Sequence, residues 1–312
     1  MKRLAVALVA VLSSLVAVAA PHAEGSSNGS SGGWLVFTRF DPAIGEDATF
    51  IRHPNGALHR LFPGGSSGPH WSPDGELVSI AACADPPACQ TAAVLVDPDT
   101  GEFTALPMPA PDRVFTSCLI WRPDGNRLAC EGFGEPDPSL TGVYTISVHG
   151  GDLRRLTWSP GGDDNPLDYS DDGTRLLFTR TKAGRPEDSG ALFVKNLPPR
   201  GKAHRITPWG FSDNQAEFSS RGGKIAFEHR GSLYFAYPNG DPVQEVRLDT
   251  VKGYGAGDFS WSPNGKRLAF LLATPKPDGS YREGIATAFA NGSHVRWITT
   301  SPTFDHQPNW QP

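Results

Sequence analysis

Acidic residues recur at equivalent positions along the sequence, and their chemistry suits a positively charged ligand. Asp164, Asp213 and Asp305 each lie five residues before an aromatic residue, Asp258 lies close to the same position in another segment, and His306 follows Asp305. A cluster of carboxylates could receive a cation, an amine or a basic peptide segment. The competing interpretation is that short aspartate side chains hydrogen-bond the backbone of their own loops before a strand begins.

A metal site is the second chemistry that these residues could support. A metal-dependent lyase would need several histidines to converge, and only His70 and His306, with Asp305 beside the latter, are placed to do so. The sequence contains no His-Glu-x-x-His, P-loop or Cys-x-x-Cys motif. We therefore expect no cofactor, assign no metal ligand and keep an enzyme only as the alternative.

Two Gly-x-Ser-x-Gly segments, at residues 29–33 and 64–68, match the nucleophile motif of serine hydrolases. Neither lies between a strand and a helix, as the nucleophile elbow requires, and both are low-complexity stretches. We therefore assign no catalytic residue to them.

The elements that would position these residues form a repeat. An aromatic residue leading into Pro-Asp-Gly, or a variant of it, recurs every 43 to 50 residues. Proline fixes the first turn angle, aspartate can bond the backbone and glycine takes the left-handed position, so each copy predicts a β-hairpin. Two further strands follow in each unit, which gives the four-stranded antiparallel blade of a β-propeller. The aromatic positions are Trp71, Trp121, Tyr169, Phe218, Trp261 and Trp310.

The two ends of the repeat region complete each other. Residues 34–39 align with second strands, whereas Trp310 belongs to a first strand with no sequel. We therefore predict an all-β fold over residues 34–312, a six-bladed β-propeller closed by pairing of the C-terminal strand with the N-terminal blade. Closure leaves no sheet edge exposed. The tryptophans of the repeat are expected to pack between blades, because they recur with the repeat.

The four cysteines have spacings that do not match a zinc site. Cys118 and Cys130 lie symmetrically on either side of a Pro-Asp-Gly turn, so they would face each other on the first two strands of the third blade. Cys83 and Cys89 bracket a loop between the second and third strands of the second blade. We predict a disulfide in each pair, although opposed cysteines can also remain free thiols. Disulfides suit an exported protein.

The N-terminal sequence predicts export. Lys2 and Arg3 precede an apolar run over residues 4–20, so residues 1–23 are expected to be a signal peptide and residues 24–33 a Gly/Ser-rich spacer. A retained membrane anchor is the alternative, but the apolar run is short for crossing a bilayer. Loss of Lys2 and Arg3 takes the formal net charge from −5 to −7, which argues against nucleic acid as a partner.

The segments WSPDGELVSI (residues 71–80), WSPNGKRLAF (261–270) and VYTISVHGGDLRRLT (143–157) resemble the WD-like repeats of TolB-type propellers. The resemblance covers residues 34–310 and implies the propeller fold. TolB proper carries a separate α/β domain ahead of its propeller, for which residues 24–33 leave no room, so we expect the propeller only. Related propellers also occur in peptidases and polysaccharide-degrading enzymes, so the resemblance is less informative about function.

The predicted fold indicates where binding would occur. The turns between first and second strands lie on one face, whereas longer loops and the crossings between blades lie on the other, and long loops on a rigid scaffold commonly carry binding sites. Residues directly before the repeat aromatics are mostly polar, which suggests a solvated channel; they are His70, Ile120, Asp168, Glu217, Ser260 and Asn309.

We predict a secreted or periplasmic, monomeric, non-catalytic module that binds a protein or small ligand through its loop-rich face and channel mouth. The residues assigned to the mouth are Asp164, Asp213, Asp258, Asp305, His306 and His70. The alternative is an extracellular metal-dependent lyase or hydrolase that acts on carbohydrate or a small ester. No nucleic-acid partner and no stable membrane insertion after signal cleavage are expected.

Overall fold

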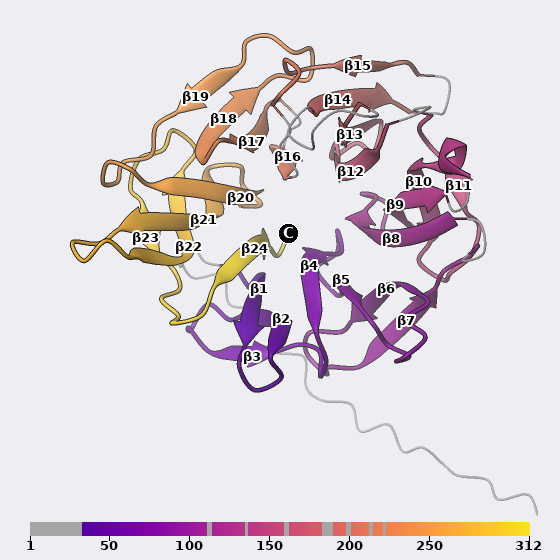
Figure 1. The fold of residues 1–312 in the computed structure, drawn as a ribbon, viewed down its shortest axis with the longest axis horizontal. Helices are drawn as coiled ribbons and strands as arrows, with labels where there is room; N and C mark the ends of the chain where they lie inside the picture. Colours follow the sequence, from indigo (N-terminus) through magenta and orange to yellow (C-terminus); the bar gives the residue numbers. More distant parts are fainter. Residues whose placement is uncertain are drawn as a thin grey trace, which may run out of the picture. The chain divides into compact units, whose positions relative to one another are not determined.

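The computed structural model describes residues 33–110, 114–134, 137–158, 162–182, 190–197, 201–211, 215–220 and 223–312. Gly32–Pro312 form one compact unit, in which six four-stranded antiparallel sheets surround a common centre (Figure 1). The predicted all-β, six-bladed propeller is therefore confirmed. Apart from a 3₁₀ turn at Pro138–Leu140, the described residues contain no helix. Accordingly, no described segment is a helix that could cross a membrane.

Each blade runs from an innermost first strand to an outermost fourth strand. In blades 2 and 3 the strands are β4 (Ser66–Trp71), β5 (Val78–Ala82), β6 (Thr91–Val96), β7 (Phe103–Pro107), β8 (Val114–Trp121), β9 (Arg127–Gly134), β10 (Gly142–Ser147) and β11 (Arg154–Arg155). In blades 4 and 5 they are β12 (Asp164–Tyr169), β13 (Arg175–Arg180), β14 (Ala191–Asn196), β15 (Ala203–Arg205), β16 (Ala216–Phe218), β17 (Ile225–His229), β18 (Ser232–Ala236) and β19 (Gln244–Val246). Blade 6 consists of β20 (Gly255–Trp261), β21 (Arg267–Pro275), β22 (Tyr281–Phe289) and β23 (Arg296–Trp297).

Blade 1 joins the two ends of the propeller. Its first strand is the C-terminal β24 (Asp305–Trp310), which pairs with β1 (Leu35–Asp41), followed by β2 (Glu46–Arg52) and β3 (Leu58–Arg60). The register places Leu35 opposite Trp310 and Arg39 opposite Asp305. The predicted closure by the C-terminal strand is confirmed, and it covers the inner edge of β1.

The repeated Pro-Asp-Gly turns have the hydrogen bonds that their sequence predicts. In blade 2 the Ser72 N–H donates to the Leu77 carbonyl (2.8 Å) and the Gly75 N–H donates to the Ser72 carbonyl (2.9 Å). Gly75 has a φ of 75°, where glycine carries no steric penalty. The Asp74 carboxylate accepts from the Glu76 N–H, so the aspartate stabilises the turn locally.

The core lies between neighbouring blades. Phe37, Phe178, Phe227 and Phe270 occupy equivalent places on second strands and are all fully buried. The repeat tryptophans are also buried, and the Trp121 indole N–H donates to the His70 carbonyl of the preceding blade (3.1 Å). The prediction that these tryptophans pack between blades is therefore confirmed.

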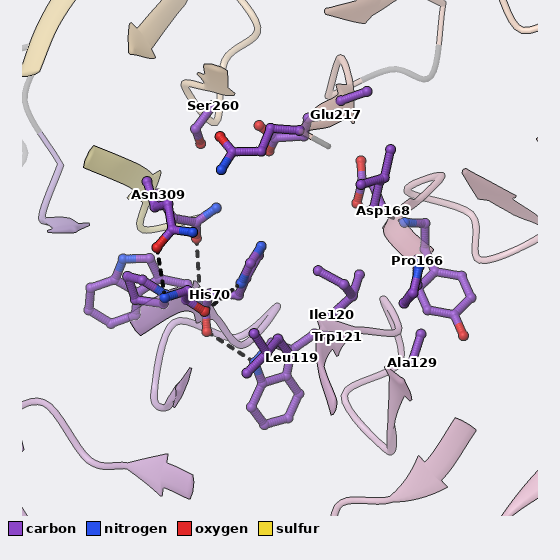
Figure 2. Close-up of a pocket in the computed structure, with 18 of the residues that line it drawn as sticks. His70, Leu119, Ile120, Trp121, Ala129, Pro166, Asp168, Glu217, Ser260 and Asn309 are labelled. Atoms are coloured by element: carbon purple, nitrogen blue, oxygen red, sulfur yellow. Dashed lines mark hydrogen bonds between the residues drawn. The ribbon is translucent and has the colours of Figure 1, made fainter. Parts of the chain in front are cut away.

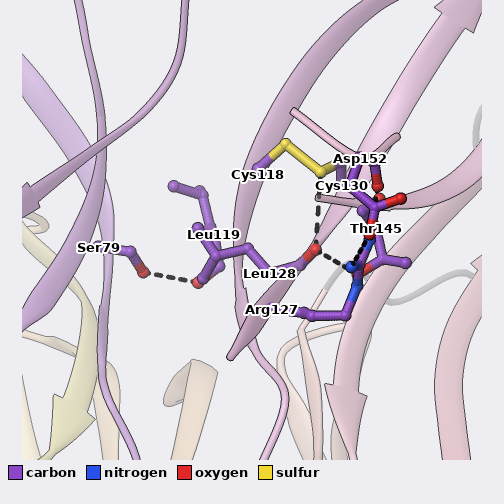
Figure 3. The surroundings of a disulfide bond; sticks show 8 residues. All are labelled: Ser79, Cys118, Leu119, Arg127, Leu128, Cys130, Thr145 and Asp152. Carbon is purple, nitrogen blue, oxygen red and sulfur yellow. Dashed lines mark hydrogen bonds and ion pairs between the residues drawn. A yellow bond between two sulfur atoms is a disulfide. The ribbon is translucent and has the colours of Figure 1, made fainter. Parts of the chain in front are cut away.

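Both predicted disulfides are present. Cys118 and Cys130 lie directly opposite each other on β8 and β9, with a Cα–Cα distance of 3.9 Å (Figure 3). Cys83 and Cys89 close the loop between β5 and β6. A cross-link that closes a loop of this size contributes roughly 2 to 3 kcal/mol by restricting the unfolded chain.

Candidate functional site

A cavity of about 700 Å³ occupies the centre of the ring and is lined by the first strands of all six blades. We call this cavity the channel. Figure 2 shows His70, Asp168, Glu217, Ser260 and Asn309 arranged around it. These residues directly precede the repeat aromatics, so the predicted channel position is confirmed for them.

Most of these side chains tie one blade to the next. Each accepts a hydrogen bond from the backbone N–H of the aromatic residue in the following blade, and these N–H groups lie on strand edges that have no sheet partner. The four bonds run from Phe218 to Asp168 (2.7 Å), from Trp261 to Glu217 (2.8 Å), from Trp310 to Ser260 (3.4 Å) and from Trp71 to Asn309 (3.0 Å). The polar positions predicted from sequence thus also link blades 4, 5, 6, 1 and 2 through hydrogen bonds.

A second set of bonds lies two residues earlier on the first strands. Asp258 accepts from the Gln307 N–H (2.8 Å), and the Gln307 side-chain oxygen accepts from the Gly68 N–H (3.0 Å). Asp258 and Gln307 have φ values of 55° and 52°, in the left-handed region that non-glycine residues rarely occupy. Backbone strain of this kind is concentrated at functional sites, and here it turns two polar side chains toward the channel.

The channel is acidic. Its described lining includes five carboxyl groups and no lysine or arginine. The carboxyl groups belong to Glu131, Asp168, Asp171, Glu217 and Asp258. Because a cavity concentrates the field of its own charges, this lining favours a positively charged ligand once its carboxyls are ionised.

Burial shifts the titration of the channel acids. Desolvation raises the pKa of Asp168 to about 8, although hydrogen bonds from the Phe218 and Tyr169 N–H groups oppose the shift. Desolvation, followed by the charge of Asp168, raises the pKa of Glu217 well above its ordinary value. Desolvation also raises the pKa of Glu131 to about 7, with a contribution from Asp163. Two neighbouring carboxyls in a desolvated site cannot both ionise easily.

His70 is the candidate residue that offers a free ring nitrogen to the channel. Its Nδ1 lies 3.0 Å from the Gly68 carbonyl, which can only accept, so we assign the proton to Nδ1 and an acceptor lone pair to Nε2. Burial lowers the pKa of His70, which keeps the ring neutral near pH 7. The side chain extends into the hollow in Figure 2.

Asp164 and Asp305 do not line the channel, and the prediction that they do is corrected. Both are buried in ion pairs: Asp164 makes two contacts of 2.6 and 2.7 Å with Arg180, and Asp305 makes two of 2.6 and 2.8 Å with Arg39. Each arginine lies directly opposite its aspartate on the second strand of the blade. Asp164 and Asp305 are therefore structural, but through ion pairs with arginine and not through the bonds to their own loop backbone that the competing interpretation proposed. Asp213 lies outside the described residues.

His306 also lies outside the channel lining. Its ring stacks on Phe304 at 4.9 Å, and its Nε2 and Nδ1 lie 3.6 and 3.9 Å from carboxylate oxygens of Asp47 and Asp258 respectively. Asp258 and Gln307, the residue after His306, do line the channel, so His306 adjoins it without being part of its lining. The described residues contain no group of three or more histidine, cysteine or acidic side chains arranged for a metal ion.

Asp168 and Glu217 form a pair that was not predicted as such from the sequence. Their repeat position predicted that both lie at the channel, but only as polar residues of a solvated lining. Their succession at one repeat position of consecutive blades, 49 residues apart, was the available signal. Among the six predicted mouth residues, the structure therefore brings His70 and Asp258 to the channel and adds Asp168 and Glu217.

No protein-family model matches the chain. A TolB homologue from Chlorobium luteolum is 30% identical over 135 residues, which is 42% of this chain and 28% of that protein. The match thus spans less than a third of the length of the curated relative.

Three solved structures share the propeller fold. A protein assigned as TolB from Agrobacterium tumefaciens has a TM-score of 0.59 and 15% identity, covering 91% of this chain and 100% of that one. An oligogalacturonate lyase in complex with manganese has a TM-score of 0.53 and 16% identity, covering 88% and 75%. A puromycin hydrolase has a TM-score of 0.56 and 15% identity, covering 88% and 53%. At these identities the likeness extends to the fold alone.

Proposed function

We propose that this chain, a TolB-like six-bladed β-propeller, is a non-catalytic binding module that takes a positively charged group into its channel. The observation that carries the proposal is the channel lining, which includes five carboxyl groups and, among its described residues, no lysine or arginine. The group would be an ammonium or guanidinium on a small ligand or on a side chain of a protein partner. Carboxylates bind both through charge-assisted hydrogen bonds.

The charge of the channel acids is not needed for the fold. Asn309 accepts the N–H of Trp71 with a neutral amide oxygen, in the same way that Glu217 accepts the N–H of Trp261 with a carboxylate. A buried carboxyl costs free energy when it ionises, whereas an amide stays neutral and carries no such cost. Retention of two carboxyls where an amide would suffice supports a role in binding.

An acid–base enzyme is the second candidate. Carboxyls whose pKa values lie near neutrality can donate and accept protons, and the pKa of Asp168 is raised to about 8. A metal-dependent enzyme would have only His70 of the two predicted histidines in the channel, because His306 is not part of the channel lining. Turnover of a simple ester or oligosaccharide that is abolished by Asp168→Asn would favour this candidate over the binding module.

A charge-matched comparison tests the binding proposal. Calorimetry would measure binding of N-acetyl-arginine amide and N-acetyl-lysine amide, with N-acetyl-norleucine amide as the neutral probe. Asp168→Asn with Glu217→Gln, which we call the channel variant, keeps the oxygen acceptors and removes two carboxyls from the channel. Asp99→Asn with Glu102→Gln, which we call the outer variant, removes two exposed carboxyls outside the channel.

We expect the cationic probes to bind the native protein and the outer variant alike, and to bind the channel variant at least tenfold more weakly. Equal binding to all three proteins, or no preference for the cationic probes over the neutral one, would contradict the proposal.

The proposed setting is outside the cytoplasm. The two disulfides persist in oxidising compartments, and the N-terminal sequence has the pattern of a signal peptide. Mass spectrometry of the exported protein should give a mature chain that begins near residue 24. A chain that retains residues 1–23 would instead support the alternative of a retained membrane anchor.

A further inference from the structure

A second pocket lies on the loop-rich face, away from the channel. It has a volume of about 240 Å³, which is room for about eight water molecules at roughly 30 Å³ each. It lies between the loop that joins β21 to β22 and the crossing, residues 300–304, that leads to β24. We call it the seam pocket, because β24 closes the ring against β1 directly beyond it. The Phe40 N–H of β1 donates to the Phe304 carbonyl (3.2 Å), which ties the pocket wall to blade 1.

The seam pocket has the opposite charge to the channel. Its lining contains Lys276 and Arg282 against one acid, Glu283. Within the described part of the chain neither cation has an ion-pair partner. Asp278, on the same turn as Lys276, has its carboxylate hydrogen-bonded to the Ser280 N–H and hydroxyl. Neither cation is therefore held in a direct ion pair, although the charge of Lys276 contributes to a lowered pKa of Asp278.

Arg282 is held in place without being neutralised. Its guanidinium lies 4.1 Å from the centre of the Trp297 ring, a cation–π contact that orients the group. A guanidinium stacked in this way keeps its N–H donors at its edge, where a carboxylate can accept two of them.

The rest of the pocket offers apolar faces and hydroxyls. Tyr281 and Phe304 are 55% and 42% exposed, although most large apolar side chains of the propeller are buried. Beside them, the Ser301 and Thr303 hydroxyls lie 2.7 Å apart, and either can be the donor. Exposed aromatic side chains that border a pocket are typical of a binding site, because their burial by a ligand removes apolar surface from water.

We propose that the seam pocket binds a small ligand in which a carboxylate is attached to a six-membered ring. The carboxylate would pair with Arg282 and Lys276, and the ring would pack against Tyr281 and Phe304. The site is independent of the channel, because the two cavities share no lining residue and carry charges of opposite sign. An acidic sugar and an aromatic acid both have this chemistry.

Four probes separate the two parts of the proposal. Glucuronate and benzoate carry a ring with a carboxylate, glucose carries the ring alone, and acetate carries the carboxylate alone. We expect glucuronate, benzoate or both to bind at least tenfold more tightly than glucose and acetate, as measured by calorimetry or by NMR titration. A preference for one of the two ring acids identifies which source the pocket accepts. Absence of binding by both, or equal binding of glucose, would overturn the proposal.

Variants of the pocket locate the site. Lys276→Gln and Arg282→Gln should each weaken the bound ring acid about tenfold, and Tyr281→Ala should weaken it without removing charge. Lys266→Gln, which changes an exposed lysine on the turn face, is the control and should leave the affinity unchanged.

Arg282→Gln also loses its contact with Trp297, so its thermal unfolding midpoint must be compared with that of Lys276→Gln. Unchanged affinity in Lys276→Gln and Tyr281→Ala would exclude this pocket. The channel variant Asp168→Asn with Glu217→Gln should bind the ring acid normally, which separates failure here from failure of the channel proposal.

Discussion

Glu217 and Asn309 have the same structural task in different blades, but only Glu217 can be charged. Each side-chain oxygen accepts the N–H of the aromatic residue that begins the next hairpin, at 2.8 and 3.0 Å. The carboxylate form of Glu217 gains the stronger hydrogen bond, yet it loses solvation inside the channel. Because desolvation has the larger effect, the pKa of Glu217 is raised. The native fold therefore prefers the protonated acid.

This preference has a consequence for stability against pH. An acid whose pKa is higher in the folded than in the unfolded chain contributes less stability as the pH rises from the unfolded toward the folded value. For Asp168 that window runs from the ordinary value of 3.8 to about 8. Asp168→Asn with Glu217→Gln keeps the acceptors and removes the titration. We expect urea unfolding to show the native protein losing about 1 to 3 kcal/mol between pH 6 and pH 8.5 relative to this variant.

The outer variant, Asp99→Asn with Glu102→Gln, controls for a general charge effect and should show the native pH dependence. If the channel variant is less stable than the native protein at pH 8.5, the carboxylates stabilise the fold and the argument for a binding role loses its basis.

At the residue scale, the sequence identified the recurring aspartates but not their partners. Asp305 and Arg39 are 266 positions apart, so no local pattern links them. A signal nevertheless exists: the tripeptide Phe-Thr-Arg occurs at residues 37–39 and 178–180, on the second strands of the two blades whose described first strands begin with aspartate. An ion pair across these strands follows only once the ring is known to close through β24.

At the scale of elements, the turn chemistry predicted most of the fold. Pro-Asp-Gly or a variant of it marked the first hairpin of blades 2 to 6, and the unmatched ends predicted the pairing of β24 with β1. The bulges of the first strands were not predicted. In blade 6 the register shifts between Gly257 and Ser260, where Asp258 adopts a positive φ. A positive φ at aspartate depends on tertiary hydrogen bonds, which local propensity does not report.

The ion pair between Arg39 and Asp305 links the first and last strands of the propeller. Asp305 is fully buried, and the Arg39 side chain is 16% exposed. Arg39→Met leaves the carboxylate buried without a partner, so the free energy of unfolding should fall by about 3 to 5 kcal/mol. The more exposed pair of Arg60 and Asp41 gives a matched control, and Arg60→Met should cost no more than about 1 kcal/mol.

Combining Arg39→Met with Asp305→Leu should recover much of the lost stability, because an apolar pair of similar volume avoids the unpaired charge. Chemical denaturation of the four proteins decides the question. Equal losses for Arg39→Met and Arg60→Met would show that the closure does not depend on this ion pair.

At the scale of the whole molecule, the channel has properties that no single blade has. Its lining combines positions that lie almost 50 residues apart, and its acidity follows from which side chains those positions carry. The sequence predicted the channel and its polar ring, because both follow from the repeat. It did not predict that Asp164 and Asp305 are kept from the channel, since that depends on the arginine that neutralises each of them.

The shared titration of these acids makes ligand binding depend on pH. A guanidinium remains charged throughout the neutral range. Any change in its affinity between pH 6 and pH 8.5 therefore reflects titration of groups on the protein. Burial places the pKa of Glu131 at about 7 and that of Asp168 at about 8, and each carboxyl that ionises adds an attraction. His70 does not oppose this effect, because its pKa is lowered and the ring stays neutral. Binding of N-acetyl-arginine amide should therefore strengthen about tenfold as the pH rises, which corresponds to one partly screened charge a few ångströms away. The dependence should flatten in Asp168→Asn with Glu217→Gln, whereas an affinity that is constant or falls with pH in the native protein would place the cation outside the channel.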